Sequence, residues 1–492
     1  MKLTYEKRTS IALLALLTAS PATLLADQFT VNSSADPVIV VPANCLSANL
    51  DCSLRDALAA ADQVAGYDSI VFDIDDPIYL TRKLISHTPV SIDGGKNTEI
   101  RVHQGYEIVT LPDVFTEYDL PTLQPTYYGK NGFGKVMLEL YGDGSEVTNL
   151  LMDGSITAPV GEQAVERIDF DSDGSTDFVL HTVENEGEVH WLIAGGILAY
   201  FDVVECPWDT NFGSIATTGS VTVKSNVLRN MDNSAIKVDF YSDIVIADNE
   251  ISGGGVGLPG AASDGIELYC GGGAVVTDNL ITQYRNGIAL STAAAATISG
   301  NEAHGNFVGI NVETPLSWDG FHMIENNTVQ GNDIFGMLLI GLTDSVIERN
   351  MATENGSNPF DQGGILLGGN VGNTVIENDT SHNSGFGMVL DRSWLNVFTD
   401  NRSSDNGGGG LILVNDAQHN QFQSNNIRRN GSGFVLAVTE AGQPFPSNNA
   451  FEANESQNNQ EFDVVDYDPV CNDAWTENKF KTVASAAPAC IK

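Results

Sequence analysis

The chain has 492 residues, and its acidic side chains outnumber its basic ones by 64 to 23, giving a formal net charge of −41. This balance argues against nucleic-acid partners, because phosphate binding requires clustered lysine and arginine. It fits calcium-rich or saline surroundings, where screening limits self-repulsion.

The first 26 residues predict a secretory signal peptide. Lys2, Lys7 and Arg8 precede an apolar run from Ile11 to Leu17, and small residues lead up to Ala26. Cleavage after Ala26 would remove three positive charges and one negative charge, so the net charge would move from −41 to −43. No later stretch approaches the roughly 20 apolar residues of a membrane span. We therefore expect a soluble protein that is secreted or held at the cell surface.

Residues 27–68 are expected to form an N-terminal cap. Ser53 can cap a helix in which Asp56 lies three residues further on, and Leu54, Leu58 and Ala61 share one face. Residues 52–57 read Cys-Ser-Leu-Arg-Asp-Ala, which resembles the Cys-Ser-Leu-Arg-Glu-Ala segment near the start of exported bacterial β-helix proteins. A helix here would cover the open edge of the first strands.

Residues 69–470 are expected to form the body of the protein. Short apolar strands begin near Ile70 and resume at Val136. Residues 111–135 hold several Pro, Tyr and Gly without a period, and we interpret them, like residues 158–195, as an insertion. The tail, residues 471–492, is expected to be a C-terminal cap that contains Trp475 and Phe480.

The second insertion predicts a structural calcium site. Oxygen-bearing side chains alternate around a glycine turn at Asp169, Asp171, Asp173, Ser175 and Asp177. Alternating oxygens of this kind are what calcium requires. An EF-hand would carry Glu at the twelfth position, where this chain has Leu180, so the loop resembles instead the calcium loops of integrin-type and related extracellular repeats. A solvated acidic turn is the alternative. The strands at Phe178 and Trp191 are expected to pair as a small hairpin.

From about Val245 to Asn459 one pattern recurs along the chain. Asparagines lie five residues apart in seven consecutive pairs: Asn301/Asn306, Asn327/Asn332, Asn350/Asn355, Asn378/Asn383, Asn401/Asn406, Asn425/Asn430 and Asn454/Asn459. The first members of successive pairs are 26, 23, 28, 23, 24 and 29 residues apart. Such a period indicates a solenoid. Each unit offers only short apolar strands after a glycine, too short for helical repeats, so the solenoid is β.

Asparagine and glycine are expected at the corners of the coils. They supply left-handed backbone positions, and stacked carboxamides can hydrogen-bond along the axis. About a dozen coils, roughly 4.8 Å apart, would make a rod about 55 to 60 Å long. Over most of residues 220–460 the pattern resembles the right-handed parallel β-helix repeats of carbohydrate-binding and sugar-hydrolysing proteins. The predicted fold is therefore all-β, a single-stranded parallel β-helix, and the resemblance implies that it is right-handed.

Strand alternation assigns side chains to the interior or to the surface. The first and third residues after each repeat glycine should point inward and the second outward. The outward stripe reads Glu267, Ala289, Asn311, Leu338, Leu366, Val389, Ile412 and Val435. Soluble monomers seldom leave such an aliphatic run bare. Either insertions cover Leu338, Leu366, Val389, Ile412 and Val435, or these residues form a surface for self-association, another partner or an apolar ligand.

The polar end of the stripe provides candidate catalytic residues. A lyase or epimerase of acidic polysaccharide needs a base for the C5 proton and a cation for the uronate carboxylate. Lys237 or Tyr269 would be the base and Arg285 the cation. The acidic surface repels polyuronates, and neither the paired-Asp and Gly-His-Gly pattern of polygalacturonases nor the Asp-Pro-His signature of alginate epimerases occurs. We therefore expect polysaccharide binding or surface adhesion, with a lyase or C5-epimerase as the alternative.

Six cysteines remain after signal cleavage, and an even number in an exported chain predicts disulfides. Of the fifteen pairings that six cysteines allow, we expect Cys45 with Cys52, Cys206 with Cys270, and Cys471 with Cys490.

Overall fold

A computed structural model gives the fold. It describes residues 26–491 apart from 48–49, 96–97, 103–135, 159–166, 169–177, 180–181, 186–187, 193–194, 201–218, 232–233, 240, 254–263, 315–320, 357–361, 440–441, 471 and 486–490. The signal peptide up to residue 25, the insertion at 111–135 and the calcium loop at 169–177 therefore lie outside the described residues.

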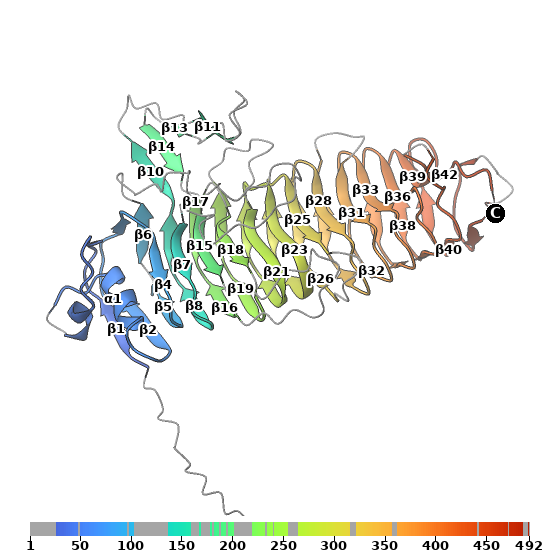
Figure 1. The fold of residues 1–492 in the computed structure, drawn as a ribbon. Helices are drawn as coiled ribbons and strands as arrows, with labels where there is room; N and C mark the ends of the chain where they lie inside the picture. The colour runs from blue at the N-terminus through green and yellow to red at the C-terminus, as the bar shows by residue number, and fades with distance from the viewer. Residues whose placement is uncertain are drawn as a thin grey trace, which may run out of the picture.

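The chain winds into one long parallel β-helix. In Figure 1 the colour passes from blue to red along a single rod, so successive coils stack in chain order. Strands of neighbouring coils pair in parallel, in register, and form three stacks that wall the rod. The predicted all-β solenoid is confirmed.

Stack 1 carries the outward stripe considered above. Its strands are β4 (Leu84–Ser86), β7 (Val136–Leu140), β15 (Gly195–Tyr200), β18 (Ile236–Asp239), the first halves of β21 (Asp264–Thr277) and β23 (Asn286–Ser299), β25 (Val308–Glu313), β28 (Phe335–Ile340), β31 (Gly363–Gly368), β33 (Phe386–Asp391), β36 (Gly409–Val414), β39 (Ser432–Ala437), β42 (Val464–Asp466) and β44 (Val483–Ser485).

Stack 2 follows stack 1 around each coil. Its strands are β1 (Gln28–Val31), β2 (Asp68–Phe72), β5 (Val90–Asp93), β8 (Ser145–Thr148), β16 (Val221–Lys224), β19 (Ile244–Ala247), the second halves of β21 and β23, β26 (Met323–Glu325), β29 (Val346–Glu348), β32 (Thr374–Ile376), β34 (Val397–Thr399), β37 (Gln421–Gln423), β40 (Ala450–Glu452) and β43 (Ala474–Thr476).

Stack 3 completes the coil. Its strands are β3 (Ile78–Leu80), β6 (Glu99–Val102), β9 (Leu151–Asp153), β17 (Val227–Met231), β20 (Glu250–Gly253), β22 (Leu280–Thr282), β24 (Glu302–His304), β27 (Thr328–Gln330), β30 (Met351–Thr353), β35 (Arg402–Ser404), β38 (Asn426–Arg428) and β41 (Glu455–Gln457).

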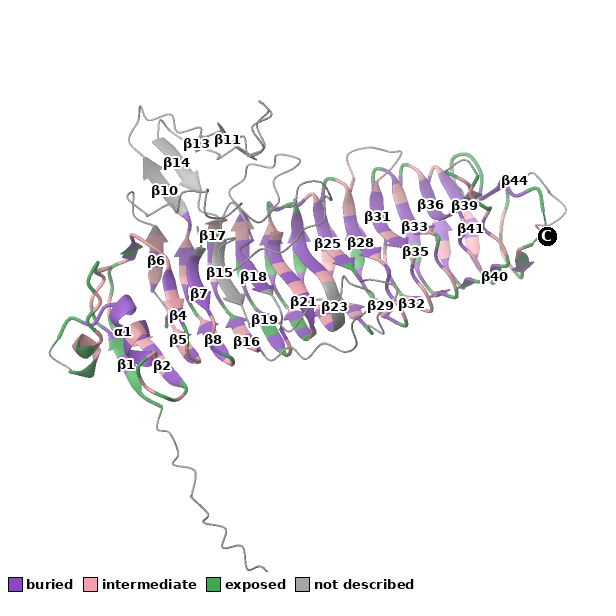
Figure 2. Cartoon of the chain, viewed as in Figure 1, coloured by how far each residue is buried: buried purple, intermediate pink, exposed green. Residues whose placement is uncertain are grey.

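The core fills the inside of the rod, and Figure 2 shows buried and intermediate positions alternating along many of the strands. Every residue expected to point inward from stack 1 is at most 1% exposed: Ile266, Leu268, Ile288, Leu290, Ile310, Val312, Met337, Leu339, Ile365, Leu367, Met388, Leu390, Leu411, Leu413, Phe434 and Leu436. The alternation read from the sequence is therefore correct throughout the repeats.

The asparagine pairs form two continuous ladders along the axis. In the first, the Oδ1 of Asn378 accepts hydrogen bonds from the backbone N–H and the Nδ2 of Asn350, both at 3.0 Å. The Nδ2 of Asn378 in turn donates to the carbonyl of Ile347 at 2.8 Å. The second ladder repeats this geometry, for example from Asn355 to Asn383. The predicted stacking of corner amides is confirmed.

The left-handed corner residue is not the ladder asparagine, which corrects the expectation above. The residue immediately before it takes the positive φ: this is glycine, as expected, at Gly300, Gly305 and Gly331, but it is also Arg349 at 51° and Glu377 at 54°. The repeat glycines are required for space instead. A Cβ on Gly387 would lie 1.9 Å from the Oγ of Ser403 and 2.4 Å from the carbonyl of Gly410 in the next coil.

Helix α1 (Leu54–Ala61) packs on β1, β2 and β4 at the first coils, preceded by a short 3-10 helix η1 (Pro42–Leu46). The N-cap is the predicted one, since the Oγ of Ser53 accepts from the backbone N–H of Asp56 at 3.1 Å. Leu54, Leu58 and Ala61 are buried. The expected capping helix is therefore present.

The cysteine predictions are confirmed only in part. Cys45 and Cys52 form a disulfide, as expected. Cys270 is also disulfide-bonded, but its expected partner Cys206 lies outside the described residues. The pair Cys471 and Cys490 does too.

Five strands are described in the second insertion and in the segment just before it. β10 (Ser155–Ala158), β14 (Glu188–Leu192) and β13 (Thr182–Asn185) form an antiparallel sheet, in that order. β11 (Arg167–Ile168) pairs antiparallel with β12 (Phe178–Val179). The strand at Phe178 therefore pairs with β11, and not with the strand at Trp191 as expected.

Candidate functional site

The predicted catalytic lysine is held in an ion pair. Lys237 on β18 is in register with Glu267 on β21, and its Nζ contacts the Oε1 of Glu267. The Oγ of Ser234 contacts the other oxygen of the same carboxylate. The Lys237 side chain is only 4% exposed, although its strand position faces outward. The ammonium group of Lys237 is thus bound to the carboxylate of Glu267, so this ion pair would have to break before Lys237 could act as a base.

A second carboxyl completes this ionic cluster. Asp264 begins β21, three residues before Glu267, and its Oδ1 accepts from the Nδ2 of Asn286 at 2.7 Å. Burial and the nearby charge of Glu267 raise the pKa of Asp264 to about 7. The positive charges of Arg285 and Lys237 lower the pKa of Asp264 and offset part of this rise. Asp264 was not expected from the sequence, since a lone Asp before a glycine carries no motif.

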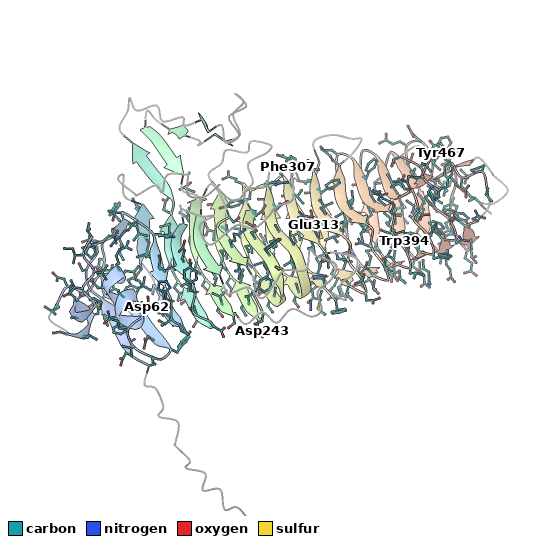
Figure 3. All side chains as sticks on the ribbon, in the orientation of Figure 1. Asp62, Asp243, Phe307, Glu313, Trp394 and Tyr467 are labelled. Carbon is teal, nitrogen blue, oxygen red and sulfur yellow. A yellow bond between two sulfur atoms is a disulfide. The ribbon has the colours of Figure 1, made fainter. Side chains whose placement is uncertain are left out.

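The three predicted catalytic residues do not surround one sugar ring. Tyr269 is in register with Ser291 of the next coil. Arg285 precedes Ser291 by six residues, so the backbones of Arg285 and Tyr269 lie roughly 20 Å apart along the strand direction. Figure 3 shows the same span one coil later, where Phe307 lies at the edge of the rod and Glu313 well down its face. The structure brings Arg285 near Asp264 and Lys237 near Glu267, with Tyr269 at the far end.

We expect Asp264→Asn to stabilise the protein at alkaline pH. The folded-state pKa of about 7 lies above the ordinary value of 3.8, so the folded state holds this proton more tightly than the unfolded state. The contribution of Asp264 to the free energy of unfolding therefore falls as pH rises from about 4 to about 7. The variant removes that fall, a gain of about 2 kcal/mol in the free energy of unfolding at pH 8 after allowing for solvent screening. Urea unfolding at pH 5 and pH 8 measures it.

The matched control is Asp333→Asn, because Asp333 is exposed on a corner of a nearby coil. It should leave the pH dependence unchanged. An Asp264→Asn protein whose stability tracks that of the parent at both pH values would contradict the assignment of a raised pKa.

The aliphatic side chains of the outward stripe pack against one another. Val389 and Ile412 are 9% and 6% exposed, and with Val414 they form a second apolar cluster outside the wall of the rod. Leu366 and Val435 pack against this cluster and stay half-buried. Branched side chains in register bury each other's flanks at this spacing. The row is therefore less bare than the sequence indicated, and self-association through it stays a prediction.

Stack 3 presents a continuous row of hydrogen-bonding side chains, which we call the polar row. Over nine coils its members lie in register and are Ser252, Thr282, His304, Gln330, Thr353, Ser381, Ser404, Arg428 and Gln457. The same register continues through the charged side chains of Arg229, Asp153 and Arg101 in the preceding coils. All except Ser381 and Ser404 are partly exposed. The row runs roughly 40 Å along the rod.

The central outward rows of the other two stacks are interrupted by apolar side chains. The interrupting side chains include Leu338 and Leu366 in stack 1, and Val346 and Val397 in stack 2. Within the described residues, the polar row is thus the longest unbroken line of donors and acceptors on the outer wall. Sequence reasoning missed it because the stripe was traced on stack 1 alone.

In the parts of the chain that the structure describes, no three His, Cys, Asp or Glu side chains gather closely enough to hold a metal ion. No helix there has the length and apolar character to span a bilayer.

Comparison with known proteins identifies the repeat. The sequence matches the family model described as "Right handed beta helix region" over residues 214–359 and 316–464. The two matches overlap and together span residues 214–464, slightly more than half of the chain. No curated protein matches the sequence.

Solved structures share the architecture at low sequence identity. Tailspike protein 3 of bacteriophage CBA120 is 11% identical, with a TM-score of 0.50 over 88% of this chain and 56% of the tailspike chain. The A-module of mannuronan C-5 epimerase AlgE4 from Azotobacter vinelandii is 14% identical, with a TM-score of 0.44 over 81% of this chain and 87% of that module. The periplasmic alginate epimerase AlgG is 14% identical, with a TM-score of 0.45 over 85% and 76% of the two chains. At these identities the likeness describes the fold alone.

Proposed function

We propose, on the premise that the chain belongs to the right-handed beta helix family, that it is an exported protein that binds a polysaccharide along its rod. Export is supported by the Cys45–Cys52 disulfide, since disulfides persist in oxidising compartments. A bound glycan would serve attachment to, or organisation of, a polysaccharide surface.

The polar row carries this proposal. Hydroxyl, amide, imidazole and guanidinium groups match the donors and acceptors of sugar hydroxyls. They repeat at the coil spacing of about 4.8 Å, which is close to the length of one pyranose unit in an extended glycan. An extended glycan lying along stack 3 would therefore meet one hydrogen-bonding side chain per sugar over several coils.

The geometry favours binding over the lyase or epimerase alternative. That reaction needs the base and the carboxylate-neutralising cation beside one sugar ring. Lys237 is paired with Glu267, and Arg285 and Tyr269 lie at opposite ends of the strand. The predicted residues therefore do not supply the two groups together.

Removing two amides from the polar row should weaken glycan binding. We expect the double variant Gln330→Ala, Gln457→Ala to bind its best glycan about tenfold or more weakly, because each lost hydrogen bond contributes about 1 kcal/mol. A glycan array identifies the ligand, and isothermal titration measures the dissociation constant.

The control carries the same substitutions on another stack. Gln421 and Gln423 are exposed on β37 of stack 2, and Gln421→Ala with Gln423→Ala should leave affinity within about twofold. Equal losses in both double variants, or no binding of any glycan, would contradict the proposal.

We also propose that the loop formed by Asp169, Asp171, Asp173, Ser175 and Asp177 binds calcium in a structural role. The backbone pairing of Ile168 with Phe178 brings the two ends of this loop together, as a cation-binding turn between two short strands requires. Carboxylates at alternate positions around a glycine then supply the oxygen ligands.

Calcium should protect this insertion. We expect saturable binding by isothermal titration, slower proteolysis near residues 169–177 in millimolar calcium, and loss of both effects in Asp171→Ala. Asp333→Ala is the control, since Asp333 is a single exposed carboxylate elsewhere on the rod. Unchanged proteolysis with and without calcium would rule out the structural role.

A further inference from the structure

The charge of the outer wall changes sign along stack 3. In its last four coils the outward positions and the corners on both sides carry five Lys or Arg and four Asp or Glu, over residues 400–405, 424–429, 453–458 and 477–481. We call this region the basic end. Counted in the same way, the six preceding coils carry seven carboxylates and one Arg, over residues 248–253, 278–283, 300–305, 326–331, 349–354 and 377–382. The basic end thus has a local excess of one positive charge in a chain of net charge −41.

Some of these cations are already paired. Arg429 contacts Asp405 through both Nε and Nη2 at 2.6 Å, and Arg428 contacts Glu455 at 2.6 Å. These pairs are half-exposed, so each has little stabilising effect on the fold. They hold the guanidinium groups in place without burying them.

Arg402 is paired as well, with Asp379 at 3.4 Å, so it is the two lysines that have no carboxylate partner among the described residues. Lys479 is exposed and makes no ion pair with any described residue. The Nζ of Lys481 donates only to the neutral Oδ1 of Asn458, at 3.0 Å. The basic end thus has two exposed ammonium groups that no described carboxylate neutralises.

We propose that the basic end binds the carboxylates of an acidic polysaccharide, and that the glycan runs from there along the polar row. This inference rests on the proposed function and specifies its ligand class. Arg428 belongs to the polar row itself, so the two features are continuous. Ammonium and guanidinium groups form charge-assisted hydrogen bonds with carboxylates. The coils on the N-terminal side of the basic end are acidic and would repel a polyanion. The anionic segment of the glycan is therefore held at the C-terminal coils.

Alginate oligomers are the probe, with carboxyl-reduced alginate as the neutral counterpart and dextran sulfate as the sulfated one. The test variant is Lys479→Gln with Lys481→Gln. We expect alginate affinity at low salt to fall about tenfold, from the loss of two charge-assisted contacts, and its salt dependence to weaken. Affinity for the carboxyl-reduced polymer should change by less than about twofold. Unchanged thermal melting shows that the fold is intact.

The matched control is Arg349→Gln with Arg392→Gln. Both arginines are about half exposed on other parts of the rod, and this variant makes the same change in net charge. An equal loss of alginate affinity in the control would overturn the inference, because only the overall charge would then matter. Dextran sulfate binding as tightly as alginate would overturn the preference for carboxylates.

The outcomes also separate this inference from the proposed function. If the carboxyl-reduced polymer binds through the polar row and the lysine variant leaves alginate affinity unchanged, the inference fails alone. If neither polymer binds, both fail.

Discussion

Asn378→Ala is expected to destabilise the middle of the rod by about 4 kcal/mol. The side chain is 1% exposed and serves three coils at once. Its loss leaves the backbone N–H of Asn350 without an acceptor and the carbonyl of Ile347 without its side-chain donor. Each buried polar group left unpaired costs about 1–3 kcal/mol. The surrounding coils cannot close over the gap, because their own ladder bonds fix the spacing.

Hydrogen exchange is the measurement that localises this effect. A solenoid loses stability through its nearest-neighbour contacts, so amides from Val346 to Asn401 should exchange faster than those near α1. Urea unfolding gives the total change. Asn472→Ala is the control, because Asn472 is exposed, and it should cost less than about 0.5 kcal/mol. Uniformly faster exchange along the whole rod would contradict a local role for the ladder.

Asn378→Asp should cost at least as much as alanine. The carboxylate keeps the acceptor that Asn350 uses, but it places a buried negative charge against the carbonyl of Ile347 and the Oδ1 of Asn401. Two ladders of this protein end in an aspartate at the last coil, whereas the ladder of Asn378 ends at Asn478. Asp473 accepts from the backbone and side-chain amides of Asn449, and Asp463 does so from Asn459. At the last coil no further asparagine is available to accept from a side-chain amide, so an acceptor alone is sufficient there.

The ladders and the inward residues could be predicted because both repeat at a fixed offset. A third ladder has the same signal and was missed. Asn373, Asn396, Asn420 and Asn449 each lie five residues before a member of the first ladder, and their amides stack in the same manner. Ser345 and His322 take the same position in earlier coils. Because the residue type at this position differs between coils, the asparagine does not recur regularly enough in the sequence to be recognised. Burial lowers the pKa of His322 to about 4, so it is a neutral part of the core and not a surface base.

The candidate site was harder to predict because its contacts join different coils. Lys237 and Glu267 are thirty residues apart, and their pairing depends on the register of β18 with β21. Alternation correctly placed both residues on the outer side, but it cannot say which outward side chains neutralise each other. The polar row and the basic end likewise become visible only when coils of unequal length are aligned, because insertions shift the sequence spacing without shifting the register.

Phe422→Ala is expected to cost about 4 kcal/mol, in the middle of the range for aromatic truncation in a core. Phe422 is 1% exposed and stacks between Phe398 and Phe451, with ring centroids 4.9 and 4.8 Å away. Trp475 continues the column 3.8 Å beyond Phe451, and Phe480 meets it edge-on. Both residues expected in the C-terminal cap thus close this column.

The cavity left by Phe422→Ala should persist. Asn420 and Asn425 lie on either side of Phe422, and each is held in its own ladder, so the coil cannot move inward to fill the space. Phe422→Leu should cost less than half as much, and Phe321→Ala, at a side chain that is 48% exposed, under about 1 kcal/mol. Urea unfolding compares the three variants, and faster hydrogen exchange should be confined to the coils from β34 to β43. If Phe422→Ala proved no more damaging than Phe321→Ala, the aromatic column would not be what holds the C-terminal end of the rod together.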